Sequence, residues 1–378
     1  MKLGIIGYGL RMQTVVGEIL RHDPDCRIAG IVDPGAPEAS DRGAPVPRYD
    51  SLAALLDGAA PDGLLIGTRC SLHTPYALQA LPTGIPLYME KPVATTLADW
   101  ARLDEASRTY DTPVVVSHPL RLTAIVQMVK EIVDSGAIGT VEHVQAVNNV
   151  PYGGVYYHSW YRDESETGGL FLQKATHDFD YINYVLGRRP VSVCAMASKQ
   201  VFKGNKPAGL RCADCEENRT CAESTVGTPN ADDWAYCCFA EDTGNEDSGS
   251  ALIRYEGGMH VSYSQNFFAR RGAAARGATF LGYKGTVSFD FVTGEVTVHH
   301  HHKPRVDRYR FDSGEGHFGG DLGLAANFVD VMRGRGPSIS TLEDGLVSAL
   351  LCLKAKEAQQ TGMYQDLNEL RAVQGAMN

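Results

Sequence analysis

The sequence lacks the features that mark membrane and nucleic-acid-binding proteins. It has no stretch approaching the roughly 20 apolar residues that a membrane-spanning helix needs, and it has no long basic run. Its 35 Lys and Arg residues are outnumbered by 45 Asp and Glu residues, which gives a net charge of −10. This acidic balance argues against nucleic acid or an anionic membrane surface as the main partner.

Cysteines and leader signals are also scarce. The chain has 9 cysteines among 378 residues, an odd number at a density too low for a disulfide scaffold. Met1-Lys2 leads directly into the apolar residues 3–6, which have the pattern of a strand and not of a cleavable signal peptide. We therefore expect a protein of the reducing cytoplasm.

The composition is otherwise that of a folded protein, with 43% hydrophobic and 21% charged residues, and the length suits two or three domains. Over the first 120 residues, short apolar runs alternate with helical patterns, which is typical of a parallel sheet with helical crossovers. We predict a doubly wound nucleotide-binding domain of the Rossmann type over residues 1–120. Its strands are expected at 2–7, 27–32, 63–66, 86–89 and 114–117, and its helices at 14–22, 52–56, 76–81 and 97–110.

Beyond residue 120 the pattern changes to strands that follow one another through Gly-rich turns. This order predicts a second α/β domain over residues 121–378 with a large, mainly antiparallel open sheet. Residues 203–249 are rich in Gly, Asn, Asp, Glu and Cys and are expected to form a long excursion from that domain. Strands are expected at 141–149, 191–198, 250–255, 259–267, 278–282, 286–291 and 295–300, and helices at 124–135, 176–186, 322–332 and 342–361.

A glycine turn after the first predicted strand points to a dinucleotide. Gly7 permits a tight turn, and Gly9 lets backbone amides approach a pyrophosphate at the start of the helix that Leu10 and Arg11 open. Met12 replaces the third glycine of the usual pattern, so the turn needs support from its context. A Rossmann-like domain that binds no dinucleotide is the alternative.

Asp33 supplies that support at the end of the second predicted strand, 26 residues after Gly7. A carboxylate there would accept hydrogen bonds from the adenosine ribose. It would also repel a 2′-phosphate, so NAD is favoured over NADP. Arg42 lies close enough in sequence to leave dual use open.

Lys91 follows the fourth predicted strand, at the carboxyl edge where parallel sheets bind their ligands. Beside a nicotinamide it would be placed to shuttle a proton. A solvated lysine at the end of a strand is the alternative.

Taken in order, these motifs resemble the Gfo/Idh/MocA oxidoreductases, named for glucose-fructose oxidoreductase and inositol dehydrogenase. The resemblance covers nearly the whole chain. It is carried by Gly7 and Gly9, Asp33, Thr68–His73, Glu90-Lys91-Pro92, Gly168-Gly169-Leu170, His177-Asp178-Phe179-Asp180 and residues 316–321.

The resemblance implies a nicotinamide cofactor, contacted also by Thr68, His73 and Glu90, and a sugar or cyclitol substrate. It implies that Lys91 contacts both substrate hydroxyl and cofactor, and that His177 does acid/base work. It further implies that the open sheet forms an oligomer interface, so we expect a homodimer or homotetramer.

This chain departs from the family at one position. The family often has an Asp four residues before the histidine, and here that residue is Gln173.

Oxidation of a secondary alcohol requires removal of the hydroxyl proton as hydride leaves the carbon, and histidine is the usual base. His177 and Lys91 would share this task, one as the base and the other stabilising the developing alkoxide. Asp180 lies three residues after His177 on the same helix face and would orient its imidazole. The alternative for His177 is a histidine packed in the core.

Several polar and aromatic residues would shape a sugar pocket. Aromatic faces pack against sugar C–H groups, while Arg and His bond hydroxyls or an anionic substituent. A simple surface segment would have the same composition. The candidates are Arg121, Tyr156, His158, Trp160, Arg162, Asp178 and His317.

Four cysteines in the excursion have the ligand count of a tetrahedral zinc site. Cys212, Cys215 and Cys221 lie close together, and Cys237 is available as a fourth. We predict a structural zinc, with an iron–sulfur cluster and free or disulfide-bonded thiols as alternatives.

The leading functional prediction is an NAD-dependent enzyme that oxidises a ring hydroxyl of a sugar, sugar derivative or cyclitol. One alternative uses the same residues as a glycoside hydrolase, through transient C3 oxidation, elimination, water addition and re-reduction. The other is a non-catalytic NAD-binding sensor.

Overall fold

The first sheet is built as the alternating pattern predicted. The structure, a computed structural model, describes residues 1–35, 37–312 and 315–368. Five strands pair in parallel in the order β2-β1-β5-β6-β7. They are β1 (Lys2–Ile6), β2 (Arg27–Val32), β5 (Gly63–Ile66), β6 (Leu87–Met89) and β7 (Val114–Val116), and a two-stranded ribbon of β3 (Ser40–Asp41) and β4 (Ala44–Pro45) follows β2.

Helices connect these strands and begin at recognisable caps. The hydroxyls of Ser51 and Thr96 accept from backbone N–H groups in the first turns of α2 and α4, which satisfies donors that a helix start leaves unpaired. A helix from far along the chain, α10, packs beside α1, with the Phe328 ring 5.6 Å from that of Tyr88 on β6. These helices are α1 (Leu10–His22), α2 (Leu52–Ala59), α3 (His73–Ala80), α4 (Leu97–Thr109) and α10 (Gly320–Met332).

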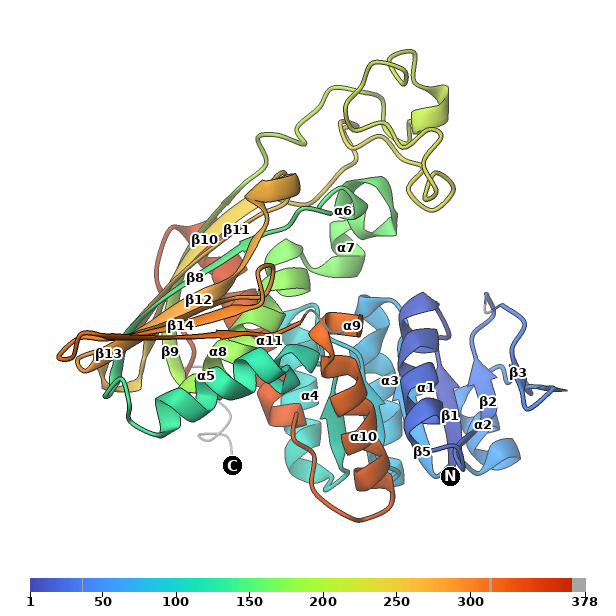
Figure 1. Cartoon of the computed structure of the whole chain (residues 1–378). Helices are drawn as coiled ribbons and strands as arrows, with labels where there is room; N and C mark the ends of the chain where they lie inside the picture. Colours follow the sequence, from blue (N-terminus) through green and yellow to red (C-terminus); the bar gives the residue numbers. More distant parts are fainter. Residues whose placement is uncertain (36, 313–314, 369–378) are drawn as a thin grey trace. The chain divides into compact units, whose positions relative to one another are not determined.

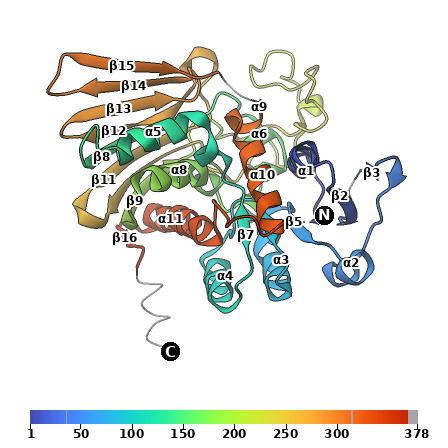
Figure 2. The ribbon, with the colours of Figure 1, turned by 60° about the horizontal axis from the view of Figure 1, so that its bottom comes forward.

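The second sheet has nine strands in the order β15-β14-β13-β12-β8-β11-β10-β9-β16 (Figure 2). Its neighbours are antiparallel except for β8 and β11, which are parallel. Strand β10 alternates buried and exposed residues, as expected of a sheet with one packed face. The strands are β8 (Val141–Asn149), β9 (Pro190–Ser198), β10 (Ser248–Tyr255), β11 (His260–Asn266), β12 (Ala275–Gly282), β13 (Gly285–Asp290), β14 (Glu295–His300), β15 (Arg305–Arg310) and β16 (Gln365–Asp366).

Of the remaining helices among the described residues, α5, α8 and α11 are long and α6, α7 and α9 are short. A π-helical turn, Phe171–Ala175, leads directly into α8 and was not expected from the sequence, nor were β15 and β16. These helices are α5 (Ala124–Asp134), α6 (Val155–His158), α7 (Glu164–Thr167), α8 (Thr176–Leu186), α9 (Glu315–Phe318) and α11 (Leu342–Thr361). Among the helices of the described residues, none is long and apolar enough to cross a membrane.

The chain divides into two compact units, each made from three segments. Of the described residues, the first unit comprises 1–35, 37–128, 176–185 and 315–351, and the second comprises 129–175, 186–312 and 352–368. Residues 176–185 and 315–351, which we expected in the second domain, therefore group with the parallel sheet. The α/β fold class with a Rossmann sheet and a large, mainly antiparallel sheet is confirmed.

The excursion between β9 and β10 is drawn as loops, yellow-green in Figure 1. It attaches to the second unit through a small hydrophobic cluster, to which it contributes Phe202 and Cys238. Their partners in the cluster include Tyr157 and Phe267, which are fully buried. This cluster gives a long polar segment an anchor among apolar side chains.

Candidate active site

The turn between β1 and α1 has the form that a dinucleotide pyrophosphate requires. Gly7 has a φ of +81°, and a Cβ there would lie 2.6 Å from the backbone nitrogen of Thr68, so only glycine fits. Helix α1 begins at Leu10, and no side chain caps its start at Gly9. The first N–H groups of α1 are therefore suited to phosphate oxygens.

Asp33 follows β2 and holds its carboxylate beside this turn. Its Oδ2 accepts a hydrogen bond from the Tyr8 N–H at 2.8 Å, and its Oδ1 accepts one from the Gly35 N–H at 2.9 Å. Each carboxylate oxygen has a further lone pair, so ribose hydroxyls can add to these bonds. The Gly7 turn and Asp33 together fit a nicotinamide dinucleotide.

Arg42, the residue that left NADP use open, lies between β3 and β4. Its guanidinium donates a hydrogen bond to the carbonyl oxygen of Pro24. That bond directs the cation to the backbone of its own unit.

Arg11, which we expected to contact the cofactor, is bonded within the protein. Its Nε donates to Glu90 Oε1 at 2.9 Å, and its terminal nitrogens donate to both carboxylate oxygens of Asp321 at 2.8 Å. A further bond of 3.1 Å reaches the hydroxyl of Ser117. Arg11 thus joins the start of α1 to the ends of β6 and β7 and to α10.

The Glu90 carboxylate anchors the segment that carries Lys91. Glu90 is buried, and its Oε1 also accepts from the hydroxyl of Ser117 at 2.8 Å. Burial alone would raise the pKa of Glu90, but Arg11 and Lys91 outweigh it and hold this pKa below its ordinary value. Lys91 therefore follows directly on an ionised, fixed carboxylate.

His73 holds the chain just beyond Lys91. Its Nδ1 lies 2.8 Å from the carbonyl oxygen of Pro92, and its Nε2 lies 3.2 Å from that of Thr68. Burial lowers the pKa of His73, although the carbonyl oxygens of Pro92 and Thr68 and the Glu90 carboxylate oppose this shift. His73 thus links the Thr68 loop to the Lys91 segment through backbone atoms.

Three imidazole rings lie in a row in the first unit. The ring centroids of His118 and His177 are 6.0 Å apart, and those of His177 and His317 are 5.6 Å apart. His317 Nδ1 lies 3.0 Å from Asp321 Oδ2, so one end of the row meets a carboxylate. Burial lowers the pKa of His317, although Asp321 opposes this shift.

Arg121 and Asp180 form a buried ion pair at the other end of the row. Arg121 donates to both oxygens of Asp180, at 3.0 Å from Nε and 2.5 Å from a terminal nitrogen, and also to Asp344. Its guanidinium lies 5.2 Å from the ring centroid of Tyr184. Arg121 was expected to bind substrate, but its side chain is 4% exposed and bonded to protein carboxylates. Asp178, another substrate candidate, is fully buried.

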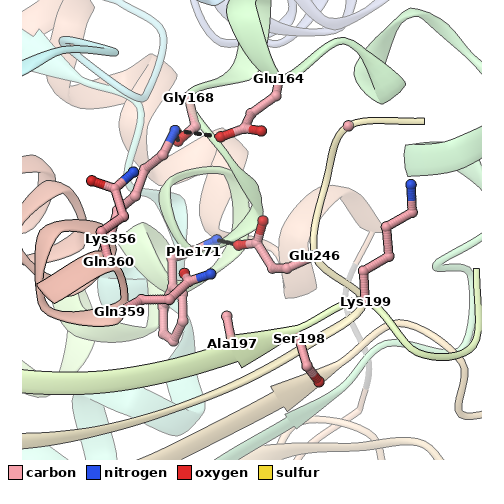
Figure 3. A pocket seen from close by; sticks show the side chains of 11 residues that line it. Glu164, Gly168, Phe171, Ala197, Ser198, Lys199, Glu246, Lys356, Gln359 and Gln360 are labelled. Carbon is pink, nitrogen blue, oxygen red and sulfur yellow. Dashed lines mark hydrogen bonds and ion pairs between the residues drawn. The ribbon is translucent and has the colours of Figure 1, made fainter. Parts of the chain in front are cut away.

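The Gly168-Gly169 turn leads into the π-helical turn ahead of α8. Gly168 and Gly169 have φ values of +75° and +105°. The N–H groups of the next two residues donate to Glu246 Oε1, at 2.9 Å from Leu170 and at 2.8 Å from Phe171. Figure 3 shows the bond from Phe171. Glu246 lines a cavity of about 350 Å³ in the second unit. The turn is therefore fixed by a carboxylate 75 residues further along the chain.

The substrate candidates of residues 156–162 lie in the second unit and contact the excursion. His158 Nδ1 lies 2.6 Å from the carbonyl oxygen of Tyr236, and Arg162 is bonded to Asp242. Tyr156 and Trp160 instead pack against the ring of Tyr161, with ring centroids 5.2 and 3.9 Å from that of Tyr161. His158 and Arg162 thus help to hold the excursion in place.

The structure does not show the zinc site predicted for the cysteines of the excursion. Across the described ranges, no group of three or more His, Cys, Asp or Glu side chains is arranged to hold a metal ion. Cys212 instead has its sulfur 3.6 Å from the carbonyl oxygen of Tyr236, and burial raises the pKa of Cys237. Cys212, Cys215, Cys221 and Cys237 are free thiols.

Several site residues gave no signal in the sequence. His118 is one of the three rings of the histidine row, and Glu246 fixes the glycine turn. Lys174, in the π-helical turn, is buried with its Nζ 4.6 Å from the ring centroid of Tyr152 and bonded to that residue's hydroxyl. A single His, Asp, Glu or Lys has no spacing pattern from which such contacts could be predicted.

Comparisons with known proteins agree with this architecture. Residues 1–118 match a family model described as "Oxidoreductase family, NAD-binding Rossmann fold", and residues 126–288 match one described as "GFO/IDH/MocA C-terminal domain". YteT of Bacillus subtilis (strain 168), named as an oxidoreductase, is 26% identical over 291 residues, which are 68% of this chain and 65% of YteT. Inositol 2-dehydrogenase of Corynebacterium glutamicum is 24% identical over 198 residues, 51% of this chain and 56% of that protein. The chain thus spans less than two thirds of the length of these relatives.

Solved structures share the fold at low identity. A levoglucosan dehydrogenase in complex with NADH and levoglucosan has a TM-score of 0.75 and 16% identity, covering 98% of this chain and all of the other. An oxidoreductase domain protein from Kribbella flavida has a TM-score of 0.75 and 17% identity, covering 97% of this chain and 99% of the other. At this low identity, the solved structures show the fold of the chain alone.

Proposed function

This chain belongs to the Gfo/Idh/MocA oxidoreductase family, and on that premise we propose that it oxidises a ring hydroxyl of a sugar, sugar derivative or cyclitol with NAD. One observation carries the proposal. The first unit holds together the Gly7 turn with Asp33, the lysine after a parallel strand, and the histidine row around His177. The names of relatives such as inositol 2-dehydrogenase support the substrate class.

The cofactor, when bound, supplies the hydride acceptor. His177 takes the proton of the substrate hydroxyl as the C–H bond breaks, because a neutral imidazole can accept a proton near pH 7. Lys91 donates an N–H to the same oxygen and so stabilises the negative charge that develops there. Glu90, bonded to Arg11 and Ser117, fixes the backbone from which Lys91 extends.

We propose NAD and not NADP as the cofactor. A 2′-phosphate would approach the Asp33 carboxylate, and two like charges at such a distance repel each other. Arg42 is bonded to Pro24, so it is directed to the backbone and not to a phosphate.

We propose a homo-oligomer that uses the open sheet. Met196 on β9 and Leu252 on β10 are 78% and 50% exposed. The register pairs Leu252 with Cys194, two residues before Met196, so both apolar side chains lie on one face of the sheet. Light scattering after size exclusion would test this, and a monomer at micromolar concentration would refute it.

The test of function is to mix the protein and NAD with myo-inositol, levoglucosan and aryl glycosides, and to record NADH and free aglycone together. NADH formed in proportion to the sugar or cyclitol consumed, and lost in Lys91→Ala, would support the proposal. Lys303→Ala, at an exposed turn residue, is the matched control and should retain activity. Aglycone in large excess over NADH would mean a redox-assisted glycosidase, and NAD binding without turnover of any substrate would favour a sensor.

A further inference from the structure

His118 is a buried histidine with one nitrogen at a carboxylate. It follows β7 and is 1% exposed. Its Nδ1 lies 3.0 Å from Asp180 Oδ1, within ion-pair distance but without the alignment of a hydrogen bond, and its Nε2 has no hydrogen-bond partner among the described residues. A buried polar atom without a partner is costly, and such atoms are often found where function requires them.

Asp180 is ionised and cannot move away from His118. Two bonds from Arg121 fix its carboxylate, and the Arg121 guanidinium is held in turn by Asp344 and by the carbonyl oxygen of Ile339. Burial alone would raise the pKa of Asp180, but Arg121 and His118 lower it to about 2. An anion 3.0 Å from Nδ1 favours the tautomer with its proton on Nδ1. That tautomer leaves Nε2 of His118 as a proton acceptor.

The imidazole of His177 is the neighbour of this acceptor. The two rings lie edge to face, with an interplanar angle of 76° and centroids 6.0 Å apart. A centroid separation of 6.0 Å leaves room for one water between a nitrogen of each ring, and the proposal below requires that bridge or a rotation of one ring. His177 in turn adjoins His317, which is 3.0 Å from Asp321.

Gln173 occupies the position at which the family often has a carboxylate. Gln173 lies in the second unit, where its Nε2 donates to the carbonyl oxygen of Thr167 at 2.9 Å. A glutamine is uncharged and cannot stabilise an imidazolium as a carboxylate does. An anion that supports His177 must therefore come from another part of the chain.

We propose that His118 and Asp180 form a positioning dyad that supports His177 in place of the carboxylate absent at Gln173. This inference rests on the proposed dehydrogenase function. As His177 accepts the substrate proton on one nitrogen, the proton on its other nitrogen passes to Nε2 of His118. His118 becomes doubly protonated, Asp180 stays ionised, and the electron pair of the broken C–H bond leaves as hydride to NAD.

Charged and titratable groups of the described residues lie near both rings. Asp180 and Arg121 face His118 on one side, and His177 faces it on the other. Beyond His177 stand His317 and Asp321, the latter compensated by Arg11. The charges of Asp180 and Arg121 nearly cancel. A proton on His118 therefore adds one positive charge, which the fixed Asp180 oxygen stabilises.

The first experiment needs no turnover, so it is independent of the proposed function. The full-length protein, labelled with ¹⁵N in its histidines, is titrated by NMR as wild type, His118→Gln and Asp180→Asn. We expect the wild-type His118 signals to show a proton on Nδ1. In His118→Gln, we expect the His177 titration midpoint to move by more than about half a pH unit. A mixed His118 tautomer, or an unchanged His177 titration in His118→Gln, would overturn the dyad.

The second experiment measures kinetics, with NAD and whichever of myo-inositol and levoglucosan the wild type oxidises. His118→Gln should lower kcat on the order of 10²-fold, with KM nearly unchanged. It should also move the acidic limb of the kcat–pH profile, which loss of packing alone would not do. His22→Gln, an exposed histidine at the end of α1, is the matched control and should match wild type.

If His118→Gln fails to fold, its thermal unfolding midpoint will show it. His118→Asn, which introduces a smaller side chain, is then used in its place. Because Asn can still donate a hydrogen bond to Asp180, it separates loss of the contact from loss of a titrating ring. Equal kcat and an identical pH profile in the folded variant would refute the proposal.

Discussion

Replacing Arg11 by Met tests whether this arginine neutralises two buried carboxylates. Methionine keeps the apolar stem of Arg11 but removes its charge and five donors. Glu90 and Asp321, which are 6% and 5% exposed, would then lose the cation that they share, and Glu90 would keep the influence of Lys91. Removing one partner of a buried ion pair costs about 3–5 kcal/mol. The Arg11 side chain is itself 30% exposed, so water would relieve part of this cost, and we expect a value near the lower limit.

A loss of about 3 kcal/mol corresponds to a fall in Tm of about 6–12 °C for a unit of this size. The assay is thermal unfolding of the full chain, followed by circular dichroism between pH 5 and pH 8. Arg21→Met is the matched control, because Arg21 is 56% exposed and pairs only at the surface with Glu18. Its Tm should lie within about 2 °C of wild type, as exposed pairs contribute little.

The pH dependence of the Arg11→Met deficit provides a second test. The pKa values of Glu90 and Asp321 are held below their ordinary values, with Arg11 as a principal cause, against the opposing effect of burial. These carboxylates therefore stabilise wild type at neutral pH, and they lose that contribution as pH falls through their lowered pKa values. In Arg11→Met, burial raises the pKa values of Glu90 and Asp321 without Arg11 to oppose it. The loss of stability relative to wild type should therefore shrink as pH falls from 7 to 5. A Tm equal to wild type, or a deficit that is constant with pH, would refute the reasoning.

Three further predictions concern the cofactor turn and the glycine turn before α8. Gly7→Ala should abolish NAD binding in calorimetry, because its Cβ would lie 2.6 Å from Thr68 N; retained affinity would show that the turn is not the pyrophosphate site. Asp33→Ala should weaken NAD binding about tenfold while leaving NADP binding less affected, and an unchanged preference between the two would argue against a ribose contact. Burial raises the pKa of Glu246, so its ionisation costs stability as pH rises through that pKa. Glu246→Gln keeps an acceptor for Leu170 N–H, so its Tm relative to wild type should increase between pH 5 and pH 8, and the opposite trend would contradict this.

Much of the fold follows from local pattern. The strand at 141–149 and the helices at 176–186 and 342–361 were predicted with the bounds that the structure has. Their hydrophobic periodicity, and the glycines that directly follow the two helices, are local signals in the sequence. Strand β15 was missed because four of its six residues are charged and only Val306 and Tyr309 are apolar. It therefore lacks the alternation of apolar and polar residues that predicts a half-buried strand.

The site was harder to predict because its contacts join residues far apart in the chain. Lys91, His177 and Asp33 were predicted as site residues from motifs and from the family resemblance. Arg121, however, pairs with carboxylates 59 and 223 residues further along, and no spacing rule reveals such partners. A buried arginine and a substrate-binding arginine look alike in sequence, since the difference lies in whether the protein supplies the anion.

The expected zinc site shows the same limit. Cysteine spacing gives a ligand count, but four thiols form a site only when the backbone brings their sulfurs to one point. Among the described residues the excursion is held by other means, including the Arg162–Asp242 pair and the apolar contacts of Phe202.

Strand β15 has a consequence for the behaviour of this chain at high concentration. It forms one margin of the nine-stranded sheet, where backbone N–H and C=O groups are unpaired on one side. Arg305, Arg308 and Arg310 project from its six residues, and nearly all of the strand is exposed. A second molecule that aligned the same strand here would bring like charges together, which disfavours sheet-to-sheet growth. The margin opposite, β16, has only two residues and offers too little length to template a partner. Both margins of this broad sheet are therefore poor templates for lateral polymerisation, one because of its charges and the other because of its length.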